Sequence, residues 1–188
     1  MSAPALRAGV FLDRDGVLNE VVVREGKALP PASLEELRIM SGAEAALHEL
    51  KAHGFALVAV TNQPDVARGA QRREVVEAIN AVLLGALPLE GIYVCYHDDA
   101  DRCTCRKPQP GLLIEAARER CIDLSRSVMI GDRWRDIEAG RRAGCLTIHL
   151  AGNHAEESPT VSPDYRTRSL LDAATWIMSQ CAPRGGRT

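Results

Sequence analysis

One short stretch, residues 10–19, constrains the fold of this chain more than any other. An apolar run ends at Leu12 and is followed by Asp13, Asp15 and then Gly16. Such a run, ending in charged residues and glycine, predicts a buried strand that leads into a turn. Side chains two residues apart in an extended segment point the same way. Asp13 and Asp15 are therefore expected to face one small volume at the carboxyl end of that strand.

Two carboxylates this close repel each other unless a cation lies between them. Mg²⁺ suits the position, because it binds one or two carboxylates and completes its coordination with water and phosphate oxygens. The alternative is an ordinary polar exit from a strand, where Asp and Gly are common. These residues alone leave both interpretations open.

The rest of the chain alternates between apolar runs and amphipathic segments. Strands are predicted at residues 55–60, 91–95, 127–132 and 145–150, and helices at 42–53, 67–84, 111–121, 134–143 and 169–180. Loops are expected at 21–41 and 153–168, and a frayed tail at 183–188. The alternation predicts an α/β fold, with a mostly parallel sheet covered by helices on both faces. Ligands bind such sheets beyond the carboxyl ends of the strands, where Asp13, Thr61 and Asp132 are expected.

Length and charge limit the possible functions. The 188 residues suit one domain, and the net charge of −2 without a basic block argues against a nucleic-acid partner. The first residues lack the apolar core of a secretory signal, and no apolar run is long enough to cross a bilayer. We therefore expect residues 1–188 to form a single domain in the cytoplasm, without a membrane partner. A monomeric state is a separate expectation that does not follow from length or charge.

Four further residues lie near the ends of predicted strands or the starts of predicted helices: Thr61, Lys107, Asp132 and Asp136. A strand-end threonine can donate its hydroxyl to a phosphoryl oxygen, but it can equally bond its own loop. A lysine before a helix lies where the backbone amides favour an anion, although a single lysine is usually solvated. The two aspartates, four residues apart at a helix start, could instead be an N-cap and a surface ion pair.

Taken in order, these signals resemble the haloacid dehalogenase (HAD) superfamily of phosphohydrolases. They are an apolar strand ending in DRDG, a strand ending in Thr61, a lysine before a helix, and a strand ending in GDxxxD, and they span about residues 9–150. The resemblance implies a three-layer, Rossmann-like sheet. The segments from Asp13 to Thr61 and from Thr61 to Lys107 are too short for a separate cap domain.

The same resemblance implies a mechanism. Asp13 would attack phosphorus and form an aspartyl phosphate. Asp15 would protonate the leaving oxygen and then activate water. Thr61 and Lys107 would bind phosphoryl oxygens, and Asp136 would orient Lys107. Mg²⁺ would be bound by the Asp13 carboxylate, the Asp15 backbone carbonyl and Asp132.

A second metal site is predicted within residues 95–105. Cys95, His97, Cys103 and Cys105 supply three thiolates and one imidazole. These four ligands complete a tetrahedral Zn²⁺ site with no position left for water, so the zinc would be structural. The residues between them cannot pack a core, and a metal would keep this small loop folded. The alternative is free thiols in a flexible loop.

The zinc loop narrows the resemblance to the heptose bisphosphate phosphatases and the related histidinol-phosphate phosphatases. The run from Thr61 to Gln63 and the later Ala67-Arg68-Gly69 are more similar to the heptose enzymes. The chain departs from them at Pro64-Asp65, where a small residue and glycine are usual. The resemblance implies substrate contacts from Arg14, Val21, Arg24, Asn62, Gln63, Arg106 and Arg133.

We therefore expect a Mg²⁺-dependent phosphatase acting on a phosphorylated sugar. The most specific expectation is removal of the 7-phosphate of D-glycero-D-manno-heptose 1,7-bisphosphate. The alternatives are histidinol phosphate or a broader range of sugar phosphates. A phosphomutase must exclude water, which the missing lid argues against. A non-catalytic scaffold would not need the full catalytic set.

Overall fold

In the computed structural model, residues 5–152 and 161–180 are described, and a six-stranded sheet forms their central layer. Its strand order is β5-β4-β1-β6-β7-β8, and all five neighbouring pairs are parallel. The strands are β1 (Gly9–Leu12), β4 (Ala56–Asn62), β5 (Gly91–Cys95), β6 (Val128–Gly131), β7 (Leu146–Leu150) and β8 (Tyr165–Thr167).

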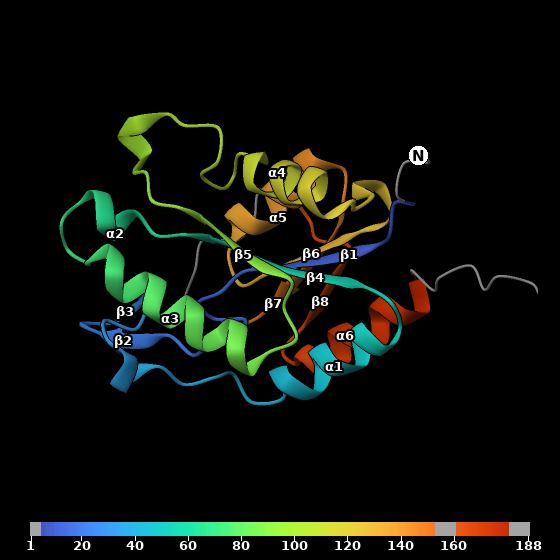
Figure 1. The fold of residues 1–188 in the computed structure, drawn as a ribbon, viewed down its shortest axis with the longest axis horizontal. Coiled ribbons are helices and arrows are strands. Elements are labelled where there is room, and N and C mark those ends of the chain that lie inside the picture. The colour runs from blue at the N-terminus through green and yellow to red at the C-terminus, as the bar shows by residue number, and fades with distance from the viewer. Residues whose placement is uncertain (1–4, 153–160, 181–188) are drawn as a thin grey trace, which may run out of the picture.

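Helices cover both faces of the sheet (Figure 1). One face carries α4 (Gly111–Arg120) and α5 (Trp134–Ala143). The other carries α1 (Ala43–Ala52), α3 (Arg73–Ala86) and α6 (Leu170–Gln180). The predicted three-layer α/β fold is therefore confirmed.

The central strand β1 explains why two helical layers are needed. Val10, Phe11 and Leu12 are all fully buried, but they belong to different cores. Val10 and Leu12 pack with α1, α3 and α6, whereas Phe11 packs with α4 and α5. Because side chains alternate across a strand, a run that is apolar at every position must be covered on both sides. This burial leaves Asp13 at the point where the strand leaves the core.

The predicted loop at residues 21–41 contains a hairpin, so that prediction was partly wrong. Strands β2 (Val22–Arg24) and β3 (Lys27–Leu29) pair antiparallel, and a 3₁₀ turn follows at Leu34–Glu36. Glu25 and Gly26 have φ values of 51° and 75°. Two consecutive residues with positive φ are typical of the tight turn that joins twisted strands. Three-residue strands are too short to show an alternating pattern.

Two other boundaries differ from the prediction. The helix expected at 67–84 is split into a short α2 (Pro64–Ala67) and α3, because Gly69 adopts a φ of 70° between them. The loop expected at 153–168 includes β8, which pairs with β7 at the edge of the sheet. Residues 153–160 and the tail at 183–188 lie outside the described residues.

No cap domain interrupts the described part of the chain. Between Asp13 and Thr61 there are the hairpin, the 3₁₀ turn and α1, and between Thr61 and Lys107 there are α2, α3, β5 and a 3₁₀ turn (Asp99–Asp101). Among the described residues, no helix combines the length and the apolar character that crossing a membrane requires.

Candidate active site

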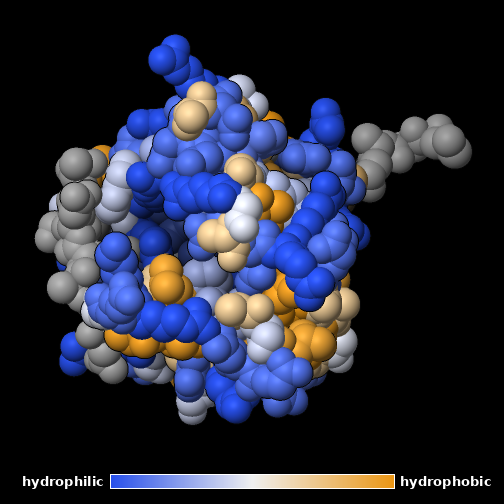
Figure 2. Space-filling view, turned by 90° about the vertical axis from the view of Figure 1, so that its left-hand side faces the viewer, coloured by the Kyte–Doolittle hydropathy of each residue, from blue (hydrophilic) through white to orange (hydrophobic). Residues whose placement is uncertain are grey.

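A cavity of about 310 Å³ lies at the carboxyl ends of β1 and β4. Asp13 and Asp15 line it from the β1 side, and Thr61 lines it from β4. Lys107 and Asp136 complete its interior. The face of the molecule at these strand ends is mostly hydrophilic, with small hydrophobic patches (Figure 2). The sheet therefore brings together the side chains that the sequence placed at strand ends.

The interior of the cavity is organised by Lys107. Its ammonium nitrogen lies 2.7 Å from Oδ1 of Asp13 and 2.6 Å from Oδ1 of Asp136, and it donates to the carbonyl of Val60 at 2.8 Å. The exposed fractions of the Lys107, Asp13 and Asp136 side chains are 2%, 9% and 1%. One buried cation is thus shared by two buried carboxylates.

Burial and the charge of the ion-pair partner shift the pKa values of Asp13 and Lys107 in opposite directions. Burial raises the pKa of Asp13 to about 6, partly opposed by the positive charge of Lys107 and reinforced by Asp136. Burial alone would lower the pKa of Lys107. The carboxylates of Asp13 and Asp136 outweigh this effect, so its pKa is raised above the usual value. Lys107 therefore stays cationic at any physiological pH.

Asp132 brings a further carboxylate to the same place. One oxygen from each of Asp13, Asp132 and Asp136 lies within 4.8 Å of the others, and all three residues are buried. Gly16 makes the approach of Asp132 possible, because a Cβ at this position would collide with Oδ2 of Asp132. Gly16 also has a φ of 88°, which strongly favours glycine. A cluster of hard oxygen donors of this kind fits Mg²⁺.

Asp15 is held by donors on both of its carboxylate oxygens. Asn19 donates to Oδ1 at 3.0 Å and Gln63 to Oδ2 at 2.7 Å. The guanidinium of Arg14 contacts both oxygens at 3.0 to 3.2 Å. Gln63 also donates to Oγ1 of Thr61 at 2.9 Å, which leaves the threonine hydroxyl hydrogen available to another acceptor. These bonds fix the orientation of Asp15 beside the cavity.

Several residues predicted to touch substrate have other partners. Arg14 is fully buried and also donates to Asn80 at 3.0 Å. Asn62 lines the cavity, but its amide group makes two hydrogen bonds of 3.0 Å to the backbone of Lys107. Arg24 pairs with Glu36. Arg14, Val21 and Arg24 are not among the residues that line this cavity, whereas Gln63, Arg106 and Arg133 are.

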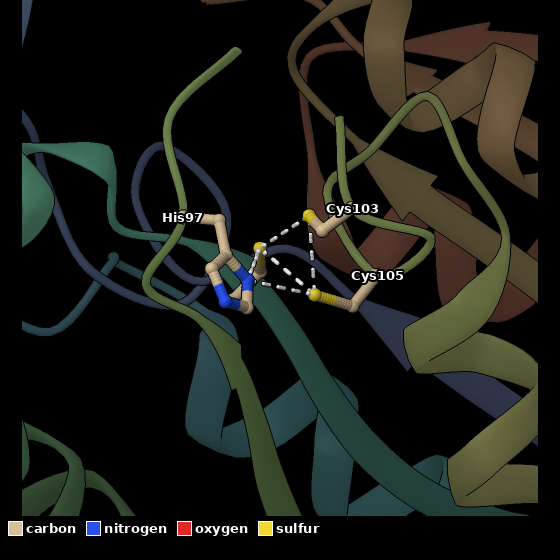
Figure 3. Close-up of side chains that lie close together, drawn as sticks. His97, Cys103 and Cys105 are labelled. Atoms are coloured by element: carbon tan, nitrogen blue, oxygen red, sulfur yellow. Dashed lines mark hydrogen bonds between the residues drawn. The ribbon is translucent and has the colours of Figure 1, made fainter. Parts of the chain in front are cut away.

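The four predicted zinc ligands converge within 4.8 Å of one another. Figure 3 shows three of them, His97, Cys103 and Cys105, facing the same small volume. The Sγ atoms of Cys95, Cys103 and Cys105 lie 3.1 to 3.7 Å apart, and Nδ1 of His97 lies 3.6 Å from Cys95 and 3.3 Å from Cys105. Sulfurs around one tetrahedral Zn²⁺ would lie about 3.8 Å apart. The cysteines are free thiols. The arrangement is thus compatible with one tetrahedral metal ion.

The thiols of this cluster differ in acidity. Burial raises the pKa of Cys95 and Cys105. Burial also opposes ionisation of Cys103, but the backbone N–H of Arg106 and the neighbouring thiols outweigh it and lower the pKa to about 7. A cation at the centre of the cluster would favour the thiolate form of all three.

Arginines surround the mouth of the cavity, and sequence reasoning missed two of them. Arg68, the residue directly after α2, donates to both oxygens of Asp98, at 2.9 and 2.6 Å. Arg106 and Arg135 both donate to Asp99. Arg68 and Arg135 lie within the Ala67-Arg68-Gly69 and GDxxxD motifs, but neither was assigned a role from the sequence. The acidic pair inside the zinc loop was a signal that basic partners are nearby.

The fold and this site together define a class of protein, the HAD-like hydrolases. Residues 104–173 match the HAD-hydrolase-like family model. A crystal structure of D,D-heptose 1,7-bisphosphate phosphatase from B. bronchiseptica, complexed with magnesium and phosphate, superposes with a TM-score of 0.74. It has 26% sequence identity, and the match covers 92% of this chain and 99% of that one.

Curated relatives narrow the class. The D-glycero-D-manno-heptose-1,7-bisphosphate 7-phosphatase of Thermosynechococcus vestitus is 34% identical over 95% of this chain and 99% of its own length. The D-glycero-beta-D-manno-heptose-1,7-bisphosphate 7-phosphatase of Pasteurella multocida is 36% identical over 89% of this chain and 95% of its own length. The chain belongs to this family of heptose bisphosphate phosphatases.

Proposed function

We propose that this protein is a Mg²⁺-dependent phosphohydrolase that removes the 7-phosphate of D-glycero-D-manno-heptose 1,7-bisphosphate. The single observation that carries the proposal is the buried arrangement of Asp13, Lys107 and Asp136 beside a cavity with an arginine-rich mouth. The names of the relatives support the substrate. The magnesium and phosphate in the B. bronchiseptica enzyme support the cofactor and the reaction type.

In this proposal Asp13 is the nucleophile. Its carboxylate attacks phosphorus, the bond to the sugar oxygen breaks, and an aspartyl phosphate forms. Asp15 donates a proton to the leaving sugar oxygen and then accepts one from the water that hydrolyses the intermediate. Its hydrogen bonds with Asn19 and Gln63 support this role, because they hold the carboxylate in one orientation beside the cavity.

Lys107 and Thr61 bind the transferred phosphoryl group. The buried ammonium and the threonine hydroxyl line the same cavity as Asp13, and both can donate to phosphoryl oxygens. Asp136 holds the ammonium from the opposite side. Asp13, Asp132 and the backbone carbonyl of Asp15 would bind Mg²⁺, which when bound neutralises part of the negative charge of the phosphate and its attacker.

We also propose that the cluster of Cys95, His97, Cys103 and Cys105 binds one structural Zn²⁺. The supporting observation is the convergence of four ligand atoms within 4.8 Å of one another. Purified protein should contain about one equivalent of zinc, and Cys105→Ser should lose it together with thermal stability. A zinc content well below half an equivalent in wild-type protein would contradict the assignment.

Histidinol phosphate is the second candidate substrate, and the site favours it less. It has one phosphate and a positively charged amine. The mouth of the cavity instead presents the guanidiniums of Arg68, Arg106 and Arg135, which suit a second anionic group.

Cytoplasmic location and a monomeric state stay predictions.

The proposal is tested by phosphate release from both anomers of heptose 1,7-bisphosphate and from histidinol phosphate, with Mg²⁺ and with a chelator. We expect Mg²⁺-dependent release from the bisphosphate at a much higher kcat/KM than from histidinol phosphate. Asp13→Asn is the control for a contaminating phosphatase. A preference for histidinol phosphate, or turnover that survives chelation, would overturn the assignment.

A further inference from the structure

Arg14 is a buried cation to which the proposed reaction gives no direct task. It is 0% exposed and is not among the residues that line the active-site cavity. Burying a guanidinium is costly unless acceptors satisfy its N–H groups and a negative charge lies nearby. A charge in such a place acts on the protein groups that it contacts. The partners of Arg14 therefore indicate its role.

The guanidinium of Arg14 is divided between two partners. Nε and Nη2 donate to Oδ1 of Asp15 at 3.2 and 3.1 Å, and Nη2 also donates to Oδ2 at 3.0 Å. Nη1 donates to Oδ1 of Asn80 at 3.0 Å. All three guanidinium nitrogens thus have an acceptor. Because the planar guanidinium has a fixed shape, these bonds hold it in one place.

Asn80 is a polar residue on the buried face of α3. Its neighbours on that face are Val76, Ile79 and Leu83, which are at most 1% exposed, and Asn80 itself is 8% exposed. A polar side chain among apolar ones lowers stability unless its hydrogen bonds are made. The side-chain carbonyl of Asn80 accepts the bond from Arg14, which lies 66 positions earlier in the chain. Arg14 is thereby anchored to a helix outside its own loop.

The carboxylate of Asp15 lies in a turn, so its orientation depends on the side chains around it. Gly16, with a φ of 88°, follows it directly. Asn19 and Gln63 each donate one hydrogen bond to this carboxylate. Arg14 adds a charged partner that contacts both oxygens. Since a group that transfers a proton must lie within hydrogen-bond reach of the reacting oxygen, loss of the Arg14 contact should slow the transfer.

We propose that Arg14 and Asn80 are positioning residues for proton transfer by Asp15. Asn80 holds the guanidinium of Arg14, and Arg14 holds the carboxylate of Asp15 toward the reacting phosphate. The inference rests on the proposed function, because it depends on Asp15 as the group that transfers the proton. It makes α3 a support of the reaction centre, and it replaces the substrate contact that the family resemblance implied for Arg14.

The first measurement is kcat and KM for heptose 1,7-bisphosphate with Mg²⁺ present. Arg14→Met should lower kcat about 10- to 100-fold, the range expected for lost charge-assisted hydrogen bonds, and leave KM within about twofold. Asn80→Leu should lower kcat about 3- to 10-fold, because the guanidinium loses one anchor but keeps Asp15. Asn80→Asp retains the acceptor and should restore most of kcat. Combining Arg14→Met with Asn80→Leu should add little to Arg14→Met alone.

The second measurement separates positioning from damage to the site. Beryllium fluoride with Mg²⁺ mimics a phosphoryl group on an aspartate carboxylate, and its binding requires no proton transfer. Calorimetry should therefore give the same dissociation constant for wild type, Arg14→Met and Asn80→Leu. Arg73→Gln is the matched control on α3, because Arg73 pairs with Glu77 at the surface, and it should leave both measurements unchanged.

Three results would overturn the inference while the wild type still hydrolyses the bisphosphate, so that the proposed function stands. They are an unchanged kcat in Asn80→Leu, a raised KM with an unchanged kcat, and a beryllium fluoride affinity that falls as much as kcat. If Arg14→Met does not fold, the comparison of Asn80→Leu with Asn80→Asp decides alone. A wild type that releases no phosphate from the bisphosphate would overturn the proposed function and the inference with it.

Discussion

The ammonium nitrogen of Lys107 lies 2.7 Å from Oδ1 of Asp13, although 94 positions separate the two residues in the chain. The contact joins the carboxyl end of β1 to the segment that follows the zinc loop. Asp136, at the start of α5, contacts the same ammonium at 2.6 Å. Three distant parts of the sequence therefore meet at one buried charge.

Lys107→Met tests the energetic role of this cation. The change leaves the carboxylates of Asp13 and Asp136 buried without their shared counter-ion, which should cost about 3–5 kcal/mol of unfolding free energy. Chemical denaturation without Mg²⁺ measures the loss. Saturating Mg²⁺ should recover part of it, because a second cation can take the place of the first. An unchanged stability in chelator would show that the pair contributes nothing to folding.

Asp136→Asn tests whether Asp136 only holds Lys107 in place or takes part in the reaction itself. The variant keeps the contact between Lys107 and Asp13 but removes the carboxylate on the other side of the ammonium. We expect kcat/KM to fall about tenfold, whereas Asp13→Asn should lower it at least about 10³-fold. Steady-state phosphate release measures both. Equal losses in the two variants would mean that Asp136 takes part in the reaction itself.

Mg²⁺ affinity should depend on pH through Asp13. Because the pKa of Asp13 is raised to about 6 in the metal-free protein, protons compete with the metal below that pH. The dissociation constant measured by calorimetry should rise about tenfold per pH unit below 6 and level off above about pH 7. Asp136→Asn should move this midpoint to lower pH, since Asp136 helps to raise the pKa. A pH-independent affinity between pH 5 and 7 would contradict this account.

Gly16→Ala tests the position of Asp132. A methyl group at residue 16 would collide with Oδ2 of Asp132 and would also strain a φ of 88°. The matched control is Gly54→Ala, which has a similar φ of 86° but no atom within 4 Å of the added methyl. Both variants should lose about 1–3 kcal/mol of stability from backbone strain. A weakened Mg²⁺ affinity is expected in Gly16→Ala alone, and equal affinities would disprove the role assigned to this contact.

Much of the fold was predictable because the burial of strands and helices leaves a strong pattern of apolar residues in the sequence. Continuous apolar runs such as the one ending at Leu12 occur where a strand is covered on both faces, and the parallel sheet follows from their alternation with helices. The hairpin at residues 22–29 was missed because its strands are three residues long. Strand β8 was missed because its place depends on tertiary contacts, including the stacking of Tyr165 on Trp176 at 5.2 Å.

The site was predictable where its residues follow strand ends. Topology alone brings Asp13, Thr61 and Asp132 to the carboxyl ends of neighbouring strands, so their proximity could be expected from the order of elements. The ion pairs at the mouth of the cavity could not be expected from that order. Asp99 and Arg135 are 36 residues apart and meet only because the zinc loop and α5 lie beside the same cavity. The role of Asp15, Thr61 and the substrate-contacting residues stays a prediction.

The central claim is that the carboxylate of Asp13 becomes phosphorylated during turnover. The most direct measurement stops the reaction with heptose 1,7-bisphosphate by acid, reduces acyl phosphates with borohydride, and maps the modified residue by mass spectrometry. We predict conversion of residue 13 to homoserine, dependent on both Mg²⁺ and substrate. Modification at Asp15, Asp132 or Asp136 instead, or full turnover with no modified aspartate in a single-turnover time course, would contradict the account.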